Sequence, residues 1–291
     1  MATDEQEANA CAEAWRVLGE YGITRPDQID IEAIAEHMNA EITYADFDGA
    51  KASVMRIRER ARIRISNRII EIGSQRFIGG HELGHLALGH EVPHGNAREV
   101  VERVCTPLAN SRKTTERLAS VFARELVMPA FMVRRYCAVP YVTLAPAREI
   151  AGEFMTSVLA SAMRLVELSH ERCAVAYSVE GRVQWMKPSA TFPQFMPRGR
   201  RVDETSAVHE FFARAKLDTS AQLVDASAWL PQRKIDDTST KIVEQSAAIP
   251  EWGAVFTMLW IPATEKVPDD VLKAHCANPR SHAHAPAARL V

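Results

Sequence analysis

Apolar residues recur every three to four positions in several stretches of the chain, a spacing typical of amphipathic helices. The first stretch covers residues 7–21 and ends at Gly22. The second follows Asp30, a residue type that favours helix N-termini, and places four apolar residues on one face: Ile31, Ile34, Ala35 and Met38. The pattern predicts two helices at the start of the chain.

Three short segments then show the pattern of β-strands: Glu41–Tyr44, Ala52–Ile57 and Ala61–Ile65. A turn is expected between the first two, at residues 46–49. The third segment alternates arginine with isoleucine, which predicts one solvated and one buried face. The edge of such a strand can pair with an extended peptide. Five arginines would then favour an acidic peptide, although a solvated charged face explains them equally well: Arg56, Arg58, Arg60, Arg62 and Arg64.

Two further helical stretches, Ala145–Phe154 and Ser157–Leu168, resemble a helix-turn-helix in length and spacing. A DNA-reading version needs basic and amide side chains along its second helix. That helix offers Ser157, Ser161 and Arg164 among apolar residues. We therefore interpret the two helices as a structural pair, and we do not expect direct DNA binding.

The C-terminal part returns to strand patterns. A hairpin is predicted from Cys173–Val179 and Arg182–Trp185, and residues 186–204, rich in proline and glycine, suit a linker. A helix around Phe211 should follow. The expected strands lie near Gln222–Trp229, Lys241–Ser246 and Ala254–Ile261, and the last is so apolar that it should be a central buried strand.

The polar pattern that bears most on function is His81-Glu82-Leu83-Gly84-His85. Residues four apart on a helix share a face, so His81 and His85 can present two imidazole nitrogens to one metal ion. Catalytic zinc takes three protein ligands and leaves one position for water. Glu82 can reach that water and act as the general base. A purely structural metal site would not need this carboxylate.

Local signals place the motif inside a helix. Ser74 is the expected N-cap, and Gly89 lies where the helix should stop. Within the helix, Gly79, Gly80 and Gly84 each cost up to ~1 kcal/mol relative to alanine. Three such costs indicate that another backbone, or a substrate, approaches this helix closely.

His90 is a candidate third ligand that the spacing does not favour. An extended form of the motif, H-E-x-x-H-x-x-G-x-x-H, supplies a third histidine ligand. It needs a glycine three positions after His85 and a histidine six positions after it. Leu88 and Glu91 occupy those positions. We therefore interpret His90 as an exposed residue at the helix end, or as one that supports a ligand.

A better candidate lies in a helix predicted over residues 115–129. Thr114 or Thr115 can cap it, Pro129 marks its end, and four apolar residues form one stripe: Leu118, Val121, Phe122 and Leu126.

Glu116 shares a different face of that helix with small residues, which would let a partner helix come close: Ala119, Ser120 and Ala123. Glu116 is therefore a candidate third ligand. A glutamate placed only to favour the helix dipole is the alternative reading. Glu125 and Glu102 are the other candidates for the third ligand.

Together these features resemble the ImmA/IrrE family of metallo-endopeptidases. The resemblance rests on Arg76-Phe77, on the H-E-L-G-H motif and on an E-x-x-A-x-x-F-A-x-x-L-x-M-P stretch from Glu116 to Pro129. It covers residues 10–130 well and 145–190 loosely, and it departs from the family at Gly79-Gly80, where a bulkier pair is usual. It implies that Glu116 is the third zinc ligand. It also implies a protein substrate, a helix-turn-helix repressor cut to release stress-response or mobile-element genes.

Composition limits the remaining classes. The net charge of −2 gives no global electrostatic case for nucleic-acid binding. We expect no secretory signal and no membrane span, because the first residues are acidic and no apolar run approaches the ~18 residues that a span needs. The five cysteines lack C-x-x-C spacing and are expected to be reduced thiols in a cytoplasmic protein: Cys11, Cys105, Cys137, Cys173 and Cys276.

The predicted fold class is α+β. A zincin-like metallopeptidase domain with a small sheet and an H-E-x-x-H helix is followed by a helical, helix-turn-helix-like region and a small C-terminal α+β domain, which is sensor-like in some family members. The expected ranges are 1–140 for the peptidase domain, 141–190 for the helix pair and hairpin, 200–275 for the C-terminal domain and 276–291 for a flexible tail.

The predicted site has His81, His85 and Glu116 as metal ligands and Glu82 as the catalytic base. Zn²⁺ is the expected cofactor, with Mn²⁺ or another divalent ion as an alternative, because two histidines and a carboxylate suit several such ions. The predicted function is limited proteolysis of a regulatory protein. The alternative is a protein that binds a regulator without cutting it and whose metal site is structural.

Overall fold

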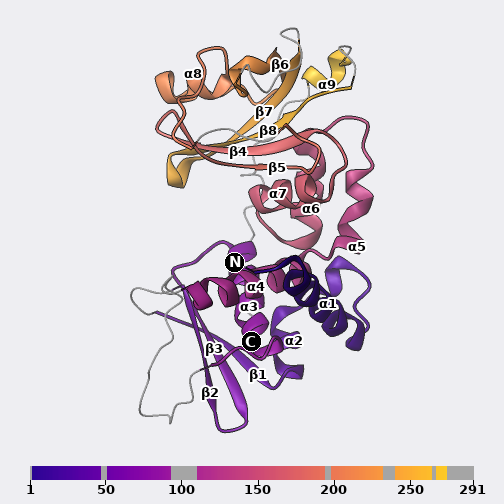
Figure 1. Cartoon of the computed structure of the whole chain (residues 1–291). Helices are drawn as coiled ribbons and strands as arrows, with labels where there is room; N and C mark the ends of the chain where they lie inside the picture. The colour runs from indigo at the N-terminus through magenta and orange to yellow at the C-terminus, as the bar shows by residue number, and fades with distance from the viewer. Residues whose placement is uncertain are drawn as a thin grey trace, which may run out of the picture. The chain divides into compact units, whose positions relative to one another are not determined.

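The computed structural model of the chain describes residues 2–46, 51–92, 110–193, 198–231, 240–263 and 267–273 (Figure 1). Several predictions fall wholly or mostly outside these residues: the turn at 46–49, the alternative ligand Glu102 and the flexible tail. The chain forms two compact units. The first consists of Met1–Ala138 and Pro146–Leu168, and the second of Val139–Ala145 and Ser169–Val291.

Two helices open the first unit, as predicted. Helix α1 spans Asp4–Glu20 and is capped by Thr3, whose hydroxyl accepts a hydrogen bond from the Gln6 backbone N–H. After the 3₁₀ turn η1 at Pro26–Gln28, helix α2 spans Ile31–His37. The Asp30 carboxylate caps α2, as the sequence predicts. The buried faces of the two helices contribute to the core of the unit.

The first unit contains a three-stranded sheet, made of β1 at Ala40–Ala45, β2 at Ala52–Ile57 and β3 at Arg60–Ser66. The strand order is β1-β3-β2, with β3 parallel to β1 and antiparallel to β2. Along β3 the isoleucines are buried, which confirms the predicted alternation.

The expectation that β3 offers its edge to a peptide is wrong. Strand β3 is central, so its backbone groups on both sides are used by β1 and β2. The two edges of this sheet are β1 and β2. Two of the arginines also have acidic partners: Arg60 pairs with Glu36 at 2.6 Å and Arg62 with Glu41 at 3.3 Å. These pairs favour the reading of a solvated, charge-compensated face.

Two long helices carry the metal motifs. Helix α3 spans Ile72–Ala87 and contains the H-E-x-x-H motif, and α4 spans Asn110–Val127. Helix α3 ends at the C-cap Leu88, and Gly89 follows with a positive φ of 64°, as predicted. Helix α4 ends just before Pro129, again as predicted.

The predicted beginnings of both helices are wrong. The N-cap of α3 is Glu71, whose carboxylate accepts a hydrogen bond from the Ser74 backbone N–H at 2.7 Å. A carboxylate at this position also interacts favourably with the helix dipole. Helix α4 begins at Asn110, upstream of Thr114 and Thr115. No glycine or proline interrupts residues 110–113, so the helix continues through them.

Shorter helices follow: α5 at Ala130–Val133, the 3₁₀ turn η2 at Arg134–Cys137, α6 at Leu144–Phe154 and α7 at Val158–Leu168. The last two are the predicted pair.

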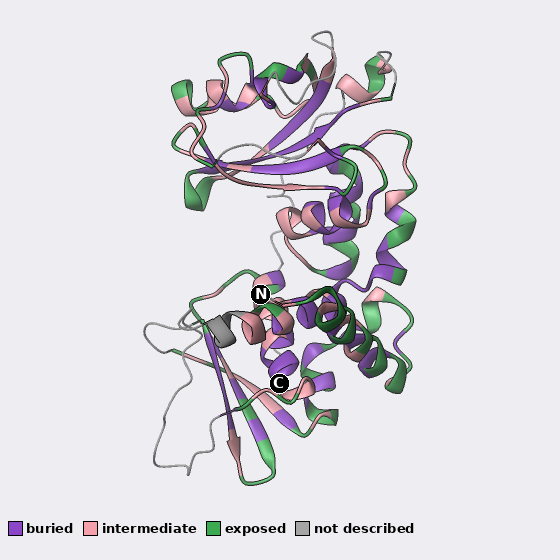
Figure 2. Ribbon diagram, viewed as in Figure 1, coloured by how far each residue is buried: buried purple, intermediate pink, exposed green. Residues whose placement is uncertain are grey.

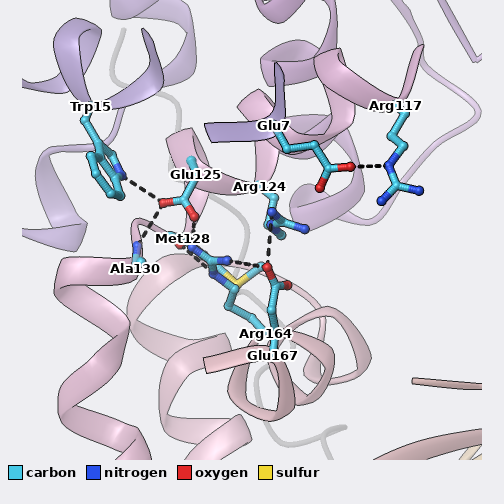
Figure 3. Close-up of polar contacts among 9 residues, drawn as sticks. All are labelled: Glu7, Trp15, Arg117, Arg124, Glu125, Met128, Ala130, Arg164 and Glu167. Atoms are coloured by element: carbon cyan, nitrogen blue, oxygen red, sulfur yellow. Dashed lines mark hydrogen bonds and ion pairs between the residues drawn. The ribbon is translucent and has the colours of Figure 1, made fainter. Parts of the chain in front are cut away.

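A buried polar cluster connects α7 to α1, α4 and α5 (Figure 3). The Glu125 carboxylate forms an ion pair with Arg164 and accepts hydrogen bonds from Trp15 Nε1 at 2.9 Å and from the Ala130 backbone N–H at 3.0 Å. Arg164 Nε also donates to the Met128 carbonyl at 3.1 Å.

The second unit is built on a five-stranded antiparallel sheet with the order β5-β4-β8-β7-β6. The strands are β4 at Cys173–Val179, β5 at Arg182–Pro188, β6 at Gln222–Asp225, β7 at Lys241–Ile249 and β8 at Ala254–Trp260. Helices α8 at Ala207–Arg214 and α9 at Asp269–Lys273 belong to the same unit, together with 3₁₀ turns at Ala226–Ala228 and Pro250–Trp252. Strand β8 is central and every residue in it is buried, as predicted (Figure 2).

Two expectations about this region are corrected. The hairpin β4–β5, which the sequence analysis grouped with the helix pair, joins the C-terminal sheet because β4 pairs with β8 along its whole length. The described residues of the predicted linker are also structured. β5 extends to Pro188, and Phe192 and Val202 are buried in the same core as Trp229. Pro188 is compatible with a strand because β5 lies at the sheet edge.

No helix among the described residues combines the length and the apolar character that crossing a bilayer requires.

Candidate metal centre

Three side chains from α3 and α4 converge. His81 Nε2 lies 3.1 Å from Glu116 Oε2, and His85 Nε2 lies 3.2 Å from His81 Nε2 and 3.5 Å from Glu116 Oε1. Within the described part of the chain, these residues form the group of potential ligands whose donor atoms all lie within 4.8 Å of one another. The structure thus brings together the three residues that the sequence predicts as ligands.

The separations fit a tetrahedral metal ion. Zinc bonds to histidine nitrogen and carboxylate oxygen of about 2.0–2.1 Å correspond to a tetrahedron whose edges are about 3.3–3.4 Å. The measured separations of 3.1, 3.2 and 3.5 Å bracket that value. Two imidazole nitrogens and one carboxylate are also an established donor set for zinc and for several other divalent ions.

Helices α3 and α4 can bring the three side chains together because the residues that face each other across the helix contact are small. A Cβ added at Gly84 would lie 3.0 Å from the Ala119 carbonyl oxygen, and one at Gly80 would lie 3.5 Å from the Ala123 Cα. The two backbones are therefore nearly in contact at these positions. This confirms the expectation that the glycines and the small residues beside Glu116 allow a close approach. Gly79 serves another contact, because its added Cβ would meet the Ile31 side chain at 3.0 Å.

The far nitrogens of both imidazoles also have partners. His81 Nδ1 lies 3.1 Å from Ser120 Oγ, and that hydroxyl donates to the Glu116 carbonyl at 2.9 Å. With its hydrogen used in this way, Ser120 can only accept from His81, so His81 carries its proton on Nδ1 and keeps the Nε2 lone pair for a metal. On the other histidine, His85 Nδ1 lies 3.0 Å from His90 Nδ1.

Of these two partners of the imidazoles, only His90 was predicted from the sequence. His90 fits the interpretation of a residue that supports a ligand. Ser120 was noted only for its small size, and its hydrogen bonds were not predicted. A serine four residues after the candidate ligand Glu116 was the available signal, since a serine hydroxyl often bonds to the carbonyl four residues earlier in a helix.

Electrostatics favour an ionised ligand at Glu116. The imidazoles of His81 and then His85, which lie against the Glu116 carboxyl, hold its pKa well below its usual range, while partial burial opposes them. The carboxylate is therefore negatively charged at neutral pH, as a metal ligand must be.

Of the two alternatives to Glu116, the structure describes Glu125 alone. Glu125 is buried in the ion pair with Arg164, so the structure gives it a different role (Figure 3). Glu102 lies outside the described residues. The proposed base, Glu82, follows His81 directly on α3, and its side chain is buried.

The site lies in a segment that matches a known peptidase family. The model of the M78 peptidases, described as the IrrE N-terminal-like domain, matches residues 35–166. Residues 35–166 form a domain of the ImmA/IrrE family. The ImmA/IrrE-type domain contains both metal motifs, and its last residues include most of α7. No curated protein matches the chain.

A search of solved structures finds relatives of the overall fold. One is described as a Mycobacterium tuberculosis transcriptional regulator, with a TM-score of 0.53 and 12% sequence identity. The alignment covers 89% of this chain and 77% of that one. At this identity the likeness shows the fold alone.

Proposed function

We propose that this protein is a metal-dependent endopeptidase that cuts a regulatory protein at one or a few sites. The observation that carries the proposal is the convergence of His81, His85 and Glu116 at separations that fit a tetrahedral ion, inside a domain of a peptidase family. Glu82, the neighbour of the first histidine, gives this site the carboxylate that hydrolysis needs.

The chemistry divides between the metal and the protein. A divalent ion held by the three ligands would lower the pKa of a water and polarise a peptide carbonyl. Glu82 would accept a proton from the attacking water and deliver one to the leaving amine. Ser120 keeps the His81 imidazole in the tautomer whose Nε2 lone pair faces the site.

The proposed substrate is a helix-turn-helix repressor, whose cleavage would switch on stress-response or mobile-element genes. The ImmA/IrrE-type domain at residues 35–166 supports this choice of substrate class. We propose that the protein acts on such a regulator rather than on DNA itself. On the second helix of the pair, Ser161 and Arg164 are buried, so neither side chain is placed to read a base.

The proposal is tested by incubating the purified protein with a candidate repressor and with zinc or manganese. We expect a discrete repressor fragment from the wild type and none from Glu82→Gln, which should still bind metal. A matched control is Glu59→Gln, which alters an exposed carboxylate in the β2–β3 turn and should cleave normally.

Two results would overturn the proposal. Cleavage by Glu82→Gln at the wild-type rate would remove the base from the mechanism. Repressor binding by the metal-loaded wild type without any fragment would favour a non-cleaving regulator-binding protein. His85→Ala should lose metal, and unchanged metal content in that variant would refute the ligand assignment.

A further inference from the structure

The imidazole of His90 lies against the nitrogen of His85 that faces away from the metal site. The two Nδ1 atoms are 3.0 Å apart, which is hydrogen-bond distance, and the ring centroids are 5.0 Å apart with an interplanar angle of 66°. At such a distance one nitrogen carries a hydrogen and the other accepts it.

The position of the hydrogen follows from the metal site. His85 Nε2 faces His81 Nε2 and the Glu116 carboxylate, so a metal there needs its lone pair. A neutral imidazole then carries its hydrogen on Nδ1. His85 Nδ1 therefore donates to His90 Nδ1, and His90 carries its own hydrogen on Nε2. One hydrogen then lies between the two Nδ1 atoms.

The backbone at the end of α3 fixes His90 in this position. Gly89 has a φ of 64°, a conformation that turns the chain back toward the helix. The His90 backbone N–H then donates to the His85 carbonyl at 2.9 Å. The same residue thus contacts His85 through both its backbone and its ring. The His85 side chain is only 2% exposed, so the protein has to supply the acceptor for its Nδ1 hydrogen.

We propose that His90 is a positioning residue of the metal centre, one that selects the Nδ1–H tautomer of His85 and holds its ring toward the ion. The inference deepens the proposed function and rests on the metal site that this function requires. Partners of this kind behind a metal-bound histidine typically change metal affinity by about 10–100-fold when removed.

Zinc titration of the full-length, metal-free protein against a chromophoric chelator tests the proposal. We expect His90→Ala to weaken zinc binding by about 10–100-fold. His90→Asn should recover most of that loss, because its amide oxygen branches from the same position as the histidine Nδ1 and can accept the hydrogen. His37→Gln is the matched control, since His37 is an exposed histidine whose Nδ1 contacts the Ala33 carbonyl, and it should bind zinc like the wild type.

The absorption spectrum of the cobalt-loaded protein adds a second readout. The ligand-field bands of His90→Ala should shift and those of His90→Asn should resemble the wild type, because only the former frees the His85 ring. Melting temperatures of the metal-free variants establish that all are folded.

Wild-type affinity in His90→Ala would overturn the inference, as would an equal loss in His90→Ala and His90→Asn, which would indicate a packing role. These outcomes are separate from failure of the proposed function. A wild type that binds zinc but cuts no repressor would refute the endopeptidase and leave the role of His90 standing. A wild type that binds no zinc would refute both.

Discussion

Each imidazole of the metal centre has different partners on its two nitrogens. The Nε2 atoms of His81 and His85 face Glu116, and their Nδ1 atoms face Ser120 and His90. The spacing of a five-residue motif fixes the first set, because helical geometry alone places both rings on one face. The second set depends on a serine from another helix and on a turn beyond the helix end. At the residue scale, the ligands were therefore predictable, whereas the hydrogen bonds to their Nδ1 atoms mostly were not.

A different buried carboxylate, in the second unit, makes stability depend on pH. Burial raises the pKa of Glu244 above its ordinary value of 4.5, although hydrogen bonds from the Ala207 backbone and the Trp229 ring oppose this. The folded state then holds the proton more tightly than the unfolded state. The resulting stability is present below pH 4.5 and is lost as the pH rises through the folded-state pKa.

Glu244→Gln should therefore lack this decline, because an amide does not ionise. We expect the free energy of unfolding of the wild type to fall relative to that of the variant as the pH rises from acid to neutral. Urea denaturation followed by tryptophan fluorescence, at a series of pH values, measures the difference. A difference that stays constant with pH would show that Glu244 titrates alike in the folded and unfolded protein.

At the scale of elements, the contact between α3 and α4 sets the geometry of the site. A methyl group at Gly84 would lie 3.0 Å from the Ala119 carbonyl oxygen and 3.1 Å from Phe122 Cδ1, closer than ordinary contact. Gly84→Ala should therefore push the helices apart, cost about 1–3 kcal/mol of stability and weaken zinc binding by moving Glu116 away from the histidines.

Gly19→Ala is the matched control for that prediction. Gly19 lies in α1, and an added Cβ there has no neighbour within 4 Å. Alanine should then stabilise the helix by up to about 1 kcal/mol and leave zinc affinity unchanged. Thermal denaturation and a chelator titration measure both quantities. Gly84→Ala with unchanged stability and zinc affinity would show that the helix contact can relax without cost.

The ion pair between Glu125 and Arg164 should contribute to stability in a way that exposed pairs do not. Removing Arg164 leaves the buried Glu125 charge without its ion-pair partner, so Arg164→Met should cost about 3–5 kcal/mol. Arg60→Met removes a pair with Glu36 in which both side chains are half exposed, and should cost no more than about 1 kcal/mol. Chemical denaturation compares the two. Equal losses would mean that burial of Glu125 imposes no penalty when its partner is removed.

The elements themselves were largely predictable, since each depends on its own residues. Alternation along β3, the Asp30 cap and the stop at Gly89 are local signals. The two helix starts were local errors, whereas contacts between distant residues caused the errors in the C-terminal region. Nothing local to the β4–β5 hairpin shows that it pairs with β8, and nothing near Phe192 shows that it enters a core with Trp229. The proline-rich composition of residues 186–204 therefore predicted a linker, although Phe192 and Val202 are packed in the core of the second unit.

At the scale of the whole molecule, the metal centre belongs entirely to one of two compact units. All three ligands lie between Met1 and Ala138, while the five-stranded sheet and its own core, around Trp229 and Leu259, belong to the other unit. A ligand that binds only the folded form of a unit stabilises that unit by mass action. Metal should therefore stabilise the first unit more than the second in solution.

Zinc at a free concentration of 100 times its dissociation constant should stabilise the first unit by about 2.7 kcal/mol. Hydrogen exchange followed by mass spectrometry can measure each unit separately. We expect slower exchange of α3 and α4 with zinc and little change in β7 and β8, and His85→Ala should abolish the effect. Equal protection of both units would mean that they unfold as one cooperative body. The C-terminal sheet would then sense metal occupancy, although none of its residues belongs to the metal-binding group.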